Sequence, residues 1–201
     1  TFYSMFGFQR VGDLIWQAAD MRTRGFLMGA TAGRTTLMGE GLQPQDGHSL
    51  VLASTVPAVQ AYDPAFAYEV GAIVDAGIKR MYGGDMPDET DVFYYITLYN
   101  ENYEMPELPD REGIAEAIVE GLYKWADAPD GEGFKPATIM FSGSAQGAAR
   151  EAVNELAEHY GVGAELWSAT SYKSLREEGL SAERHNRLHP LGEQRVPRIT
   201  Q

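Results

Sequence analysis

The sequence predicts an α/β fold: a parallel-sheet, three-layer α/β domain followed by the start of a second α/β domain. Strand-like and helix-like segments alternate through both halves of the 201 residues, as is typical of α/β proteins. Val92 to Tyr99 is rich in β-branched and aromatic residues without alternation, which favours a strand covered on both faces. Residues 137–141, 148–160 and 164–168 read as strand, helix and strand. Such a unit has a right-handed crossover and parallel strands by default.

The first third of the chain predicts a helix, a strand, a loop and a second strand. Residues 10–24 carry apolar residues at helical spacing and end in a basic turn with glycine, which predicts a helix. Residues 26–30 are a short apolar run bounded by glycine, which predicts a buried strand. The glycine-rich stretch 31–48 predicts a long loop, and loops of that length are usually functional. Residues 49–55 fit either a strand or a helix, and residues 57–62 read as a strand.

The clearest predicted helix follows Asp63 and Pro64, which are expected to be its N-cap and first residue. Its end is expected at Gly83-Gly84. Glu69 lies off the apolar stripe of this helix, so it is expected to be solvated or to lie at a subunit interface. The stripe consists of Phe66, Val70, Ile73, Val74, Ile78 and Met81.

A domain boundary is expected near residue 105. Residues 100–110 are rich in acids and proline, and residues 127–136 are rich in Gly, Pro and Asp, which is typical of linkers. The predicted organisation is 1–105 as the C-terminal part of the first domain, 106–136 as a connector helix and linker, and 137–201 as the N-terminal part of the second domain. The connector helix is marked by Ile114, Ile118, Leu122 and Trp125.

Charge and composition exclude several classes of partner. With 16 basic and 29 acidic residues, a net charge of −13 disfavours binding to nucleic acid or to an anionic membrane. The chain has no cysteine, which excludes disulfides and thiolate metal sites and is compatible with a cytoplasmic location. The longest apolar run, 92–99, is shorter than the roughly 18 residues that span a bilayer. Because Thr1 opens an aromatic run without a methionine, the chain is expected to begin inside a strand.

Several long strings carry a resemblance to a known family. In the same order along the chain, they resemble the homodimeric-type pyruvate dehydrogenase decarboxylating component of bacteria, a thiamine-diphosphate-dependent member of the transketolase-like superfamily. The resemblance is weakest at residues 83–91 and 110–136. The strings are YSMFGFQRVGDLIWQAADMRTRGFLMGATAGRTTLMGEGLQ, DGHSLVLAST, AYDPAFAYEV, YYITLYNENYEMP, SATSYKSLREEGL and ERHNRLHPLGEQRVPRITQ.

The resemblance implies that this chain is an internal fragment. It would begin partway through the middle, pyrimidine-binding-like domain and end partway through the transketolase C-terminal-like domain. The domain that binds the diphosphate and magnesium, and the glutamate that activates the aminopyrimidine, would lie upstream. The fragment alone is therefore expected to be inactive.

The implied function is pyruvate dehydrogenase (acetyl-transferring) activity. The full enzyme would use thiamine diphosphate to decarboxylate pyruvate oxidatively and pass the acetyl unit to the lipoyl group of dihydrolipoamide acetyltransferase, feeding acetyl-CoA formation. The implied partners are a second copy in a homodimer and the lipoyl domain. Two alternatives stay open: a catalytically silent dimerisation or interaction domain of the same fold, or another thiamine-dependent enzyme of the transketolase type.

The resemblance also implies which residues bind the cofactor. Phe6 would stack on the aminopyrimidine and Tyr3 would lie beside it, both at the end of an opening strand and before a helix at Arg10. The carboxyl edge of a sheet is where α/β proteins usually bind ligands. Alternatively, both aromatics are core residues. Arg10 would hold an anion or carboxylate, or else be a helix-surface arginine.

The glycine-rich loop departs from the family at one position. Residues 29–41, including Glu40, resemble the loop that reaches the mouth of the active site. The family carries a histidine facing the substrate where this chain has Pro44, and proline has neither a titratable group nor a backbone donor. His48 is the possible substitute, so the catalytic assignment stays open. No spacing around Asp46 and His48 matches a metal site, and none is predicted.

Overall fold

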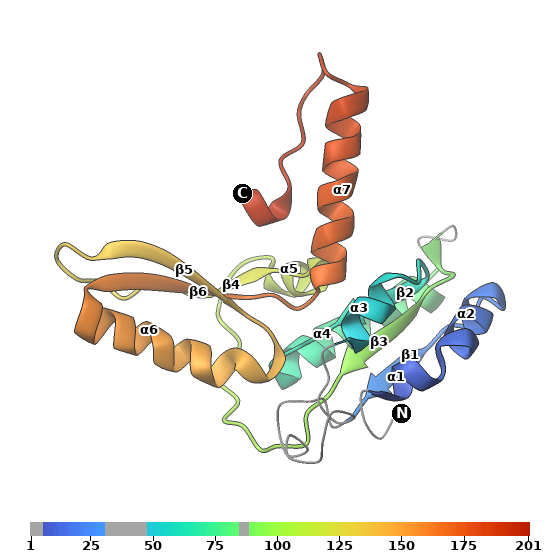
Figure 1. Ribbon diagram of the computed structural model, residues 1–201, viewed down its shortest axis with the longest axis horizontal. Helices are drawn as coiled ribbons and strands as arrows, with labels where there is room; N and C mark the ends of the chain where they lie inside the picture. Colours follow the sequence, from blue (N-terminus) through green and yellow to red (C-terminus); the bar gives the residue numbers. More distant parts are fainter. Residues whose placement is uncertain (1–5, 31–47, 85–88) are drawn as a thin grey trace.

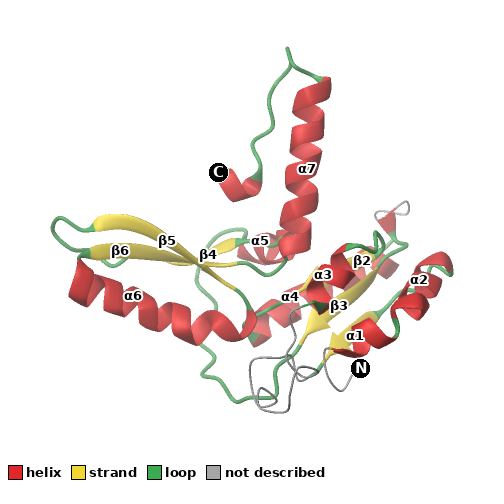
Figure 2. Ribbon diagram, in the orientation of Figure 1, coloured by secondary structure: helices red, strands yellow, loops and turns green. Residues whose placement is uncertain are grey.

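The chain folds into two sheet-based units that pack against each other (Figure 1). The computed structural model describes residues 6–30, 48–84 and 89–201. Each unit contains a three-stranded sheet covered by helices (Figure 2). Among the described residues, no helix is both long and apolar enough to cross a membrane.

The first sheet is entirely parallel. Its strands are β1 (Phe26–Gly29), β2 (Val59–Tyr62) and β3 (Phe93–Thr97), in the order β1-β3-β2. The central strand β3 is buried along its whole length, and its side chains alternate between two cores. Phe93 and Tyr95 pack on one face, whereas Tyr94 and Ile96 pack on the other. A strand buried on both faces needs no polar alternation, and this confirms the predicted three-layer domain.

Five helices cover the two faces of this sheet. On one face lie α1 (Phe6–Arg10), α2 (Gly12–Asp20) and α3 (Ser49–Ser54), whose buried residues join the cluster that contains Tyr95. On the other face lie α4 (Ala67–Tyr82) and α5 (Ile114–Glu120), which share the cluster that contains Tyr94. Ile73 and Met81 of the predicted apolar stripe of α4 are buried against the sheet, whereas Ile78 of that stripe is exposed, and Gly83 caps the end of the helix.

The second sheet mixes directions. Strand β5 (Lys135–Phe141) runs parallel to β6 (Val162–Ser168), and helix α6 (Gln146–Tyr160) connects them. The predicted strand–helix–strand unit is therefore confirmed. Strand β4 (Tyr123–Ala126) pairs antiparallel with the other edge of β6, in the order β4-β6-β5. The core between α6 and its sheet continues into the first unit through Phe66.

Helix α7 (Tyr172–Leu188) leaves the second sheet and projects away from it, and the last residues return beside it (Figure 1). Asn186 and Arg195 join the two segments by two hydrogen bonds of 2.9 and 2.8 Å, one in each direction. The 3₁₀ turn η3 (Arg198–Thr200) is tied to α7 by the amide of Arg198, which donates to the carboxylate of Glu178. The C-terminal segment is thus held by local polar contacts.

Three predicted elements differ from the observed ones. The helix expected at 10–24 is two short helices, and the second stops at Asp20, before Arg22 adopts a positive φ of 54°. The ambiguous stretch 49–55 is helical. Asp63 and Pro64 do not start the next helix, which begins at Ala67, because the Asp63 side chain is engaged in tertiary hydrogen bonds.

The expected connector helix is also shorter than predicted. It ends at Glu120, and Trp125 lies in strand β4 instead. Gly121 ends the helix with a φ of 108°. A Cβ at this glycine would lie 2.8 Å from the carbonyl oxygen of Ser171, so the turn depends on the absence of a side chain. The boundary predicted near residue 105 stays a prediction.

Candidate functional site

The carboxyl ends of the three parallel strands of the first sheet meet at one edge, which faces the second unit. Helix α1 lies at the end of the sheet toward which β1 and β3 point (Figure 1). Asp63 follows β2 directly, and Tyr99 lies two residues beyond β3. Because parallel α/β sheets bind ligands outside the carboxyl ends of their strands, this edge is the candidate functional site.

Asp63 is the polar centre of the edge and is only 4% exposed. Its carboxylate accepts hydrogen bonds from the hydroxyls of Thr97 at 2.6 Å, Ser142 at 2.8 Å and Tyr99. Its carbonyl accepts from the amide of Gly143, where a Cβ would collide with the Tyr99 hydroxyl and the Asp63 carboxylate. Since Ser142 and Gly143 belong to the second unit, Asp63 joins the two units through one hydroxyl donor and one backbone amide donor.

Glu69 forms a second polar contact between the units and is completely buried. One carboxylate oxygen accepts from the hydroxyls of Ser168 at 2.6 Å and Tyr123 at 2.7 Å. The other accepts from the amides of Ala65 at 2.5 Å and Phe66 at 3.2 Å. Burial raises the pKa of Glu69, and the four donated hydrogen bonds oppose that rise. The expectation that Glu69 is solvated or at a subunit interface is therefore wrong.

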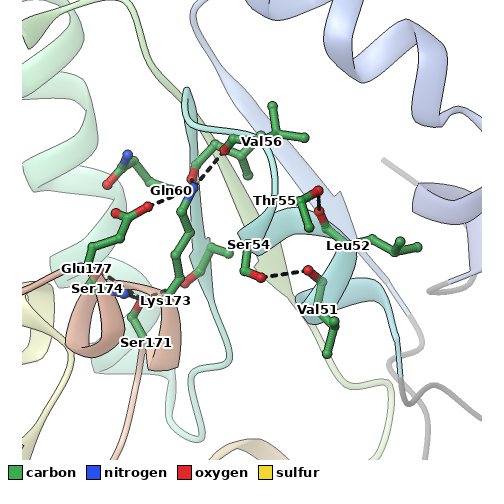
Figure 3. Close-up of polar contacts among 12 residues, drawn as sticks. Val51, Leu52, Ser54, Thr55, Val56, Gln60, Ser171, Lys173, Ser174 and Glu177 are labelled. Atoms are coloured by element: carbon green, nitrogen blue, oxygen red, sulfur yellow. Dashed lines mark hydrogen bonds and ion pairs between the residues drawn. The ribbon is translucent and has the colours of Figure 1, made fainter. Parts of the chain in front are cut away.

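Lys173 forms the third contact, reaching from α7 to the loop between α3 and β2 (Figure 3). Its ammonium donates to the carbonyl oxygens of Val56 at 2.7 Å and Val59 at 2.5 Å, and it lies 3.5 Å from the carboxylate of Glu177. The side chain is almost fully buried, and burial lowers the pKa of the ammonium, an effect that Glu177 opposes. All three ammonium protons thus have an acceptor, so Lys173 clamps α7 to the segment that runs from the end of α3 to the first residue of β2.

The structure places only some of the predicted site residues. Tyr3 and Pro44 lie outside the described residues, as does the side chain of Phe6. The backbone of Phe6 begins helix α1 and is not part of an opening strand, so that expectation is corrected. Arg10 ends α1 and is exposed, and His48 is exposed at the N-cap position of α3.

Helices α1 and α3 nevertheless lie side by side. Phe8 and Ala53 belong to the same buried cluster, and the ring of Phe8 packs 4.7 Å from the ring of Tyr95. The helices that carry Phe6, Arg10 and His48 therefore share one face of the sheet. Their cofactor and catalytic roles remain predictions.

Sequence reasoning did not identify Asp63 or Lys173 as members of this site. The sequence does contain one sign that Lys173 is unusual. Ser171 caps α7, so Lys173 lies in the first turn of this helix. The positive end of the helix dipole disfavours a cation there. A lysine at this position needs compensation, and the two carbonyls and Glu177 provide it. For Asp63, the local Asp-Pro pattern pointed to a cap instead. Within the described segments, no cluster of three or more His, Cys, Asp or Glu side chains could hold a metal ion.

Solved structures of transketolases share this fold. The transketolase of Campylobacter jejuni has a TM-score of 0.66 at 15% identity and covers 92% of this chain and 26% of its own. A transketolase from Leishmania mexicana has a TM-score of 0.66 at 14% identity, with 90% and 24% covered. At these identities the likeness concerns the fold alone. It agrees with the transketolase-like architecture that the resemblance implied.

Curated relatives are much closer in sequence. The pyruvate dehydrogenase E1 component of Mycolicibacterium smegmatis is 50% identical over 199 residues, 99% of this chain. That of Escherichia coli K12 is 50% identical over 200 residues, and that of Pseudomonas aeruginosa is 48% identical over 189 residues. The chain spans about a fifth of the length of these relatives. Residues 1–106 match the profile described as pyruvate dehydrogenase E1 component middle domain. The chain therefore belongs to the pyruvate dehydrogenase E1 component middle domain family.

Proposed function

We propose that the full-length protein containing this chain is a pyruvate dehydrogenase that decarboxylates pyruvate oxidatively and transfers the acetyl group to a lipoyl group. The observation that carries the proposal is the identity of about 50% along essentially the whole chain to proteins named pyruvate dehydrogenase E1 component. The family match over residues 1–106 gives further support. Dihydrolipoamide acetyltransferase, through its lipoyl domain, and a second copy of the protein are the proposed partners, and the proposed location is the cytoplasm.

The proposed cofactor is thiamine diphosphate, with its diphosphate and magnesium held by the upstream part of the protein. When bound, thiamine diphosphate supplies the carbanion that attacks the keto carbon of pyruvate. Its aminopyrimidine needs an apolar, largely dry slot, where preorganised groups act strongly. The core beside α1 is apolar, because Phe8 is 2% exposed and packs on the fully buried ring of Tyr95, which supports an apolar environment for the neighbouring Phe6.

Three residues of this chain are assigned to that site. Phe6, in the first turn of α1, is proposed to stack on the aminopyrimidine, with Tyr3 beside it. Arg10, at the end of the same helix, is proposed to hold an anionic group, for which a guanidinium offers two parallel donors. No proton transfer is assigned within the chain, because Pro44 stands where the family carries a histidine.

Pro44 also supports a second candidate, a domain of the same fold that has lost the chemistry. Removing a positioned acid–base group typically lowers a rate by roughly 100- to 10,000-fold. His48 lies four residues farther along, at the N-terminus of α3, and is the side chain that would take over in an active enzyme. The two candidates thus make different predictions for one substitution.

The test compares the full-length wild type with Pro44→His. We expect Pro44→His to raise pyruvate turnover by at least about tenfold. Pro190→His is the matched control, because Pro190 is exposed beyond the end of α7 and its substitution should change nothing. Turnover is measured at saturating cofactor, first with an artificial electron acceptor and then with the lipoyl acceptor.

The outcomes separate the candidates. If the wild type turns over pyruvate and His48→Ala abolishes this turnover, the result would support decarboxylation with His48 in place of the family's histidine. No turnover by the wild type with recovery in Pro44→His would support the silent domain. Equal turnover by wild type and Pro44→His in both assays would show that position 44 carries no chemistry. Turnover of sugar phosphates without any dependence on a lipoyl acceptor would instead indicate a transketolase.

A further inference from the structure

A cavity of about 270 Å³ lies at the edge of the first sheet, between helix α3, the end of strand β2 and the first turns of helix α7. Leu50 and Val51 line it from α3, and Ala61 lines it from β2. Figure 3 shows Ser54 of α3 on one side and Lys173, from the start of α7, on the other, and both residues line the cavity. A water-sized group occupies roughly 30 Å³, so the cavity has room for a molecule of about nine heavy atoms.

One cation that lines the cavity has no hydrogen bond or ion pair within the described residues. Lys173 has three acceptors, one of them the carboxylate of Glu177. The Asp63 carboxylate also contributes to the wall; it accepts from three neutral hydroxyls and forms no ion pair in the described part of the chain. Arg176 also lines the cavity and is exposed, and no hydrogen bond or ion pair joins it to any residue in the described part of the chain.

One further polar side chain of the lining can donate a hydrogen bond to an anion. The Tyr172 side chain is 52% exposed and has no partner among the described residues, so its hydroxyl is available as a donor. The Ser54 hydroxyl gives its proton to the carbonyl oxygen of Val51 at 2.6 Å and therefore offers no donor to an anion. An apolar body with one carboxylate matches this arrangement. A guanidinium binds a carboxylate with two parallel hydrogen bonds. The aliphatic side chains of the lining would contact the apolar body of the ligand.

We propose that this cavity binds a small organic acid that has an apolar body of about six carbons and a single carboxylate, with the carboxylate paired to Arg176. Ligand sites are commonly concave, mostly apolar and equipped with a few polar groups that fix orientation. The cavity joins α3 of the first unit to α7 of the second, so an occupant would contact both units. The proposal does not depend on the decarboxylation of pyruvate.

The test is a ligand-observed NMR titration of the full-length protein with hexanoate. Acetate, hexylamine and 1-hexanol serve as comparison probes, because acetate lacks the apolar body, hexylamine reverses the charge and 1-hexanol has none. The variants are Arg176→Gln, which removes the charge, and Ser54→Leu, which fills the cavity. Arg187→Gln on the same helix is the matched control, since Arg187 is exposed and lies outside the cavity lining.

We expect hexanoate to bind with millimolar affinity and to bind about fivefold more weakly to Arg176→Gln, in line with one charge-assisted contact at a partly exposed site. Arg187→Gln should bind as the wild type does, and Ser54→Leu should lose binding while its unfolding temperature stays unchanged. Acetate and hexylamine should bind at least about tenfold more weakly than hexanoate.

Three results would overturn the proposal. The first is no hexanoate binding up to about 10 mM. The second is that Arg176→Gln binds hexanoate as tightly as Arg187→Gln does, or that the wild type binds 1-hexanol as tightly as hexanoate. Either finding would show that the carboxylate does not contact Arg176. The third is equal affinity for acetate and hexanoate, which would deny the apolar body.

Discussion

Substitution of Glu69 tests how the two units are joined. The carboxylate is completely buried and accepts four hydrogen bonds, two from hydroxyls and two from backbone amides. The hydroxyl donors are Tyr123 and Ser168, which belong to the second unit. If Glu69 were solvated, as the sequence-based expectation had it, substitution would hardly change the free energy of unfolding. The experiment therefore distinguishes a solvated Glu69 from a buried, hydrogen-bonded one.

The expected loss of stability differs between two variants. Glu69→Ala leaves four buried donors without this acceptor, and each unpaired buried group costs about 1–3 kcal/mol. Tyr123 retains an alternative acceptor in the Tyr68 hydroxyl at 3.4 Å, so we expect a total loss of about 3–5 kcal/mol. Glu69→Gln can keep its oxygen toward the amides, while its NH₂ group donates to hydroxyls that rotate. The expected loss is then about 1 kcal/mol.

The pH dependence of the Glu69→Gln difference has a defined sign. Burial raises the pKa of Glu69 in the folded state. A group whose pKa is higher in the folded state stabilises the fold fully below its unfolded pKa, and this contribution is lost as the pH rises through the folded pKa. Glutamine does not titrate. The free energy of unfolding of the wild type, minus that of Glu69→Gln, should therefore fall as the pH rises from about 4.

The assay is urea denaturation of the 201-residue chain, followed by far-ultraviolet circular dichroism between about pH 4 and pH 8. Glu183→Gln on α7 is the matched control, because Glu183 is exposed and the same atom is replaced. A loss below about 1 kcal/mol for Glu69→Ala would refute the buried network. A wild-type advantage over Glu69→Gln that grows with pH would refute the raised pKa.

Three further predictions address the clamp and the cofactor. Lys173→Met should lower the free energy of unfolding by about 2–3 kcal/mol, because the carbonyls of Val56 and Val59 lose a buried charged donor; urea denaturation beside the exposed control Lys79→Met measures this, and equal losses would contradict it. In the full-length protein, Phe6→Ala should weaken thiamine diphosphate binding by about 1–3 kcal/mol, the usual range for stacking of a base on an aromatic ring; unfolding with normal binding by the folded fraction would show a core role. The isolated chain should bind thiamine diphosphate negligibly, so tight magnesium-dependent binding in a calorimetric titration would exclude that expectation.

The parts of the fold that the sequence predicts correctly are those defined by burial. Strand β3 was predicted because both of its faces are apolar, and it is buried along its whole length. Helix α4 was predicted because its stripe repeats at helical spacing, and the structure buries Ile73 and Met81 of that stripe. The unit β5–α6–β6 was predicted because short strand-like segments flank a segment with helical spacing, and the structure pairs β5 and β6 in parallel. Such patterns are local consequences of covering a sheet with helices.

Strand β4 was missed because its pattern is ambiguous. Ile118, Leu122 and Trp125 repeat at helical spacing, and only the first of them is in the helix. Gly121 interrupts the helix at a φ of 108°, and beyond it Trp125 stacks on Phe66 from the first unit, with ring centroids 5.8 Å apart. A single glycine inside a periodic segment does not by itself end a helix. The contact between Trp125 and Phe66 is a tertiary one, so the local sequence pattern does not reveal that Trp125 lies in a strand.

The polar residues at the junction were unpredictable for a different reason: their partners are distant in sequence. Asp63 meets Ser142, and Lys173 meets Val56, at separations of 79 and 117 residues. Local rules therefore assigned Asp63 to a helix cap and Glu69 to solvent. Apolar burial is non-directional, so the shared clusters can hold two units together without fixing how they are oriented. The buried carboxylates and the ammonium impose directions and distances, because leaving any of them unpaired is costly. It follows that Asp63, Glu69 and Lys173 set the orientation of the two units, while the apolar contacts supply most of the cohesion.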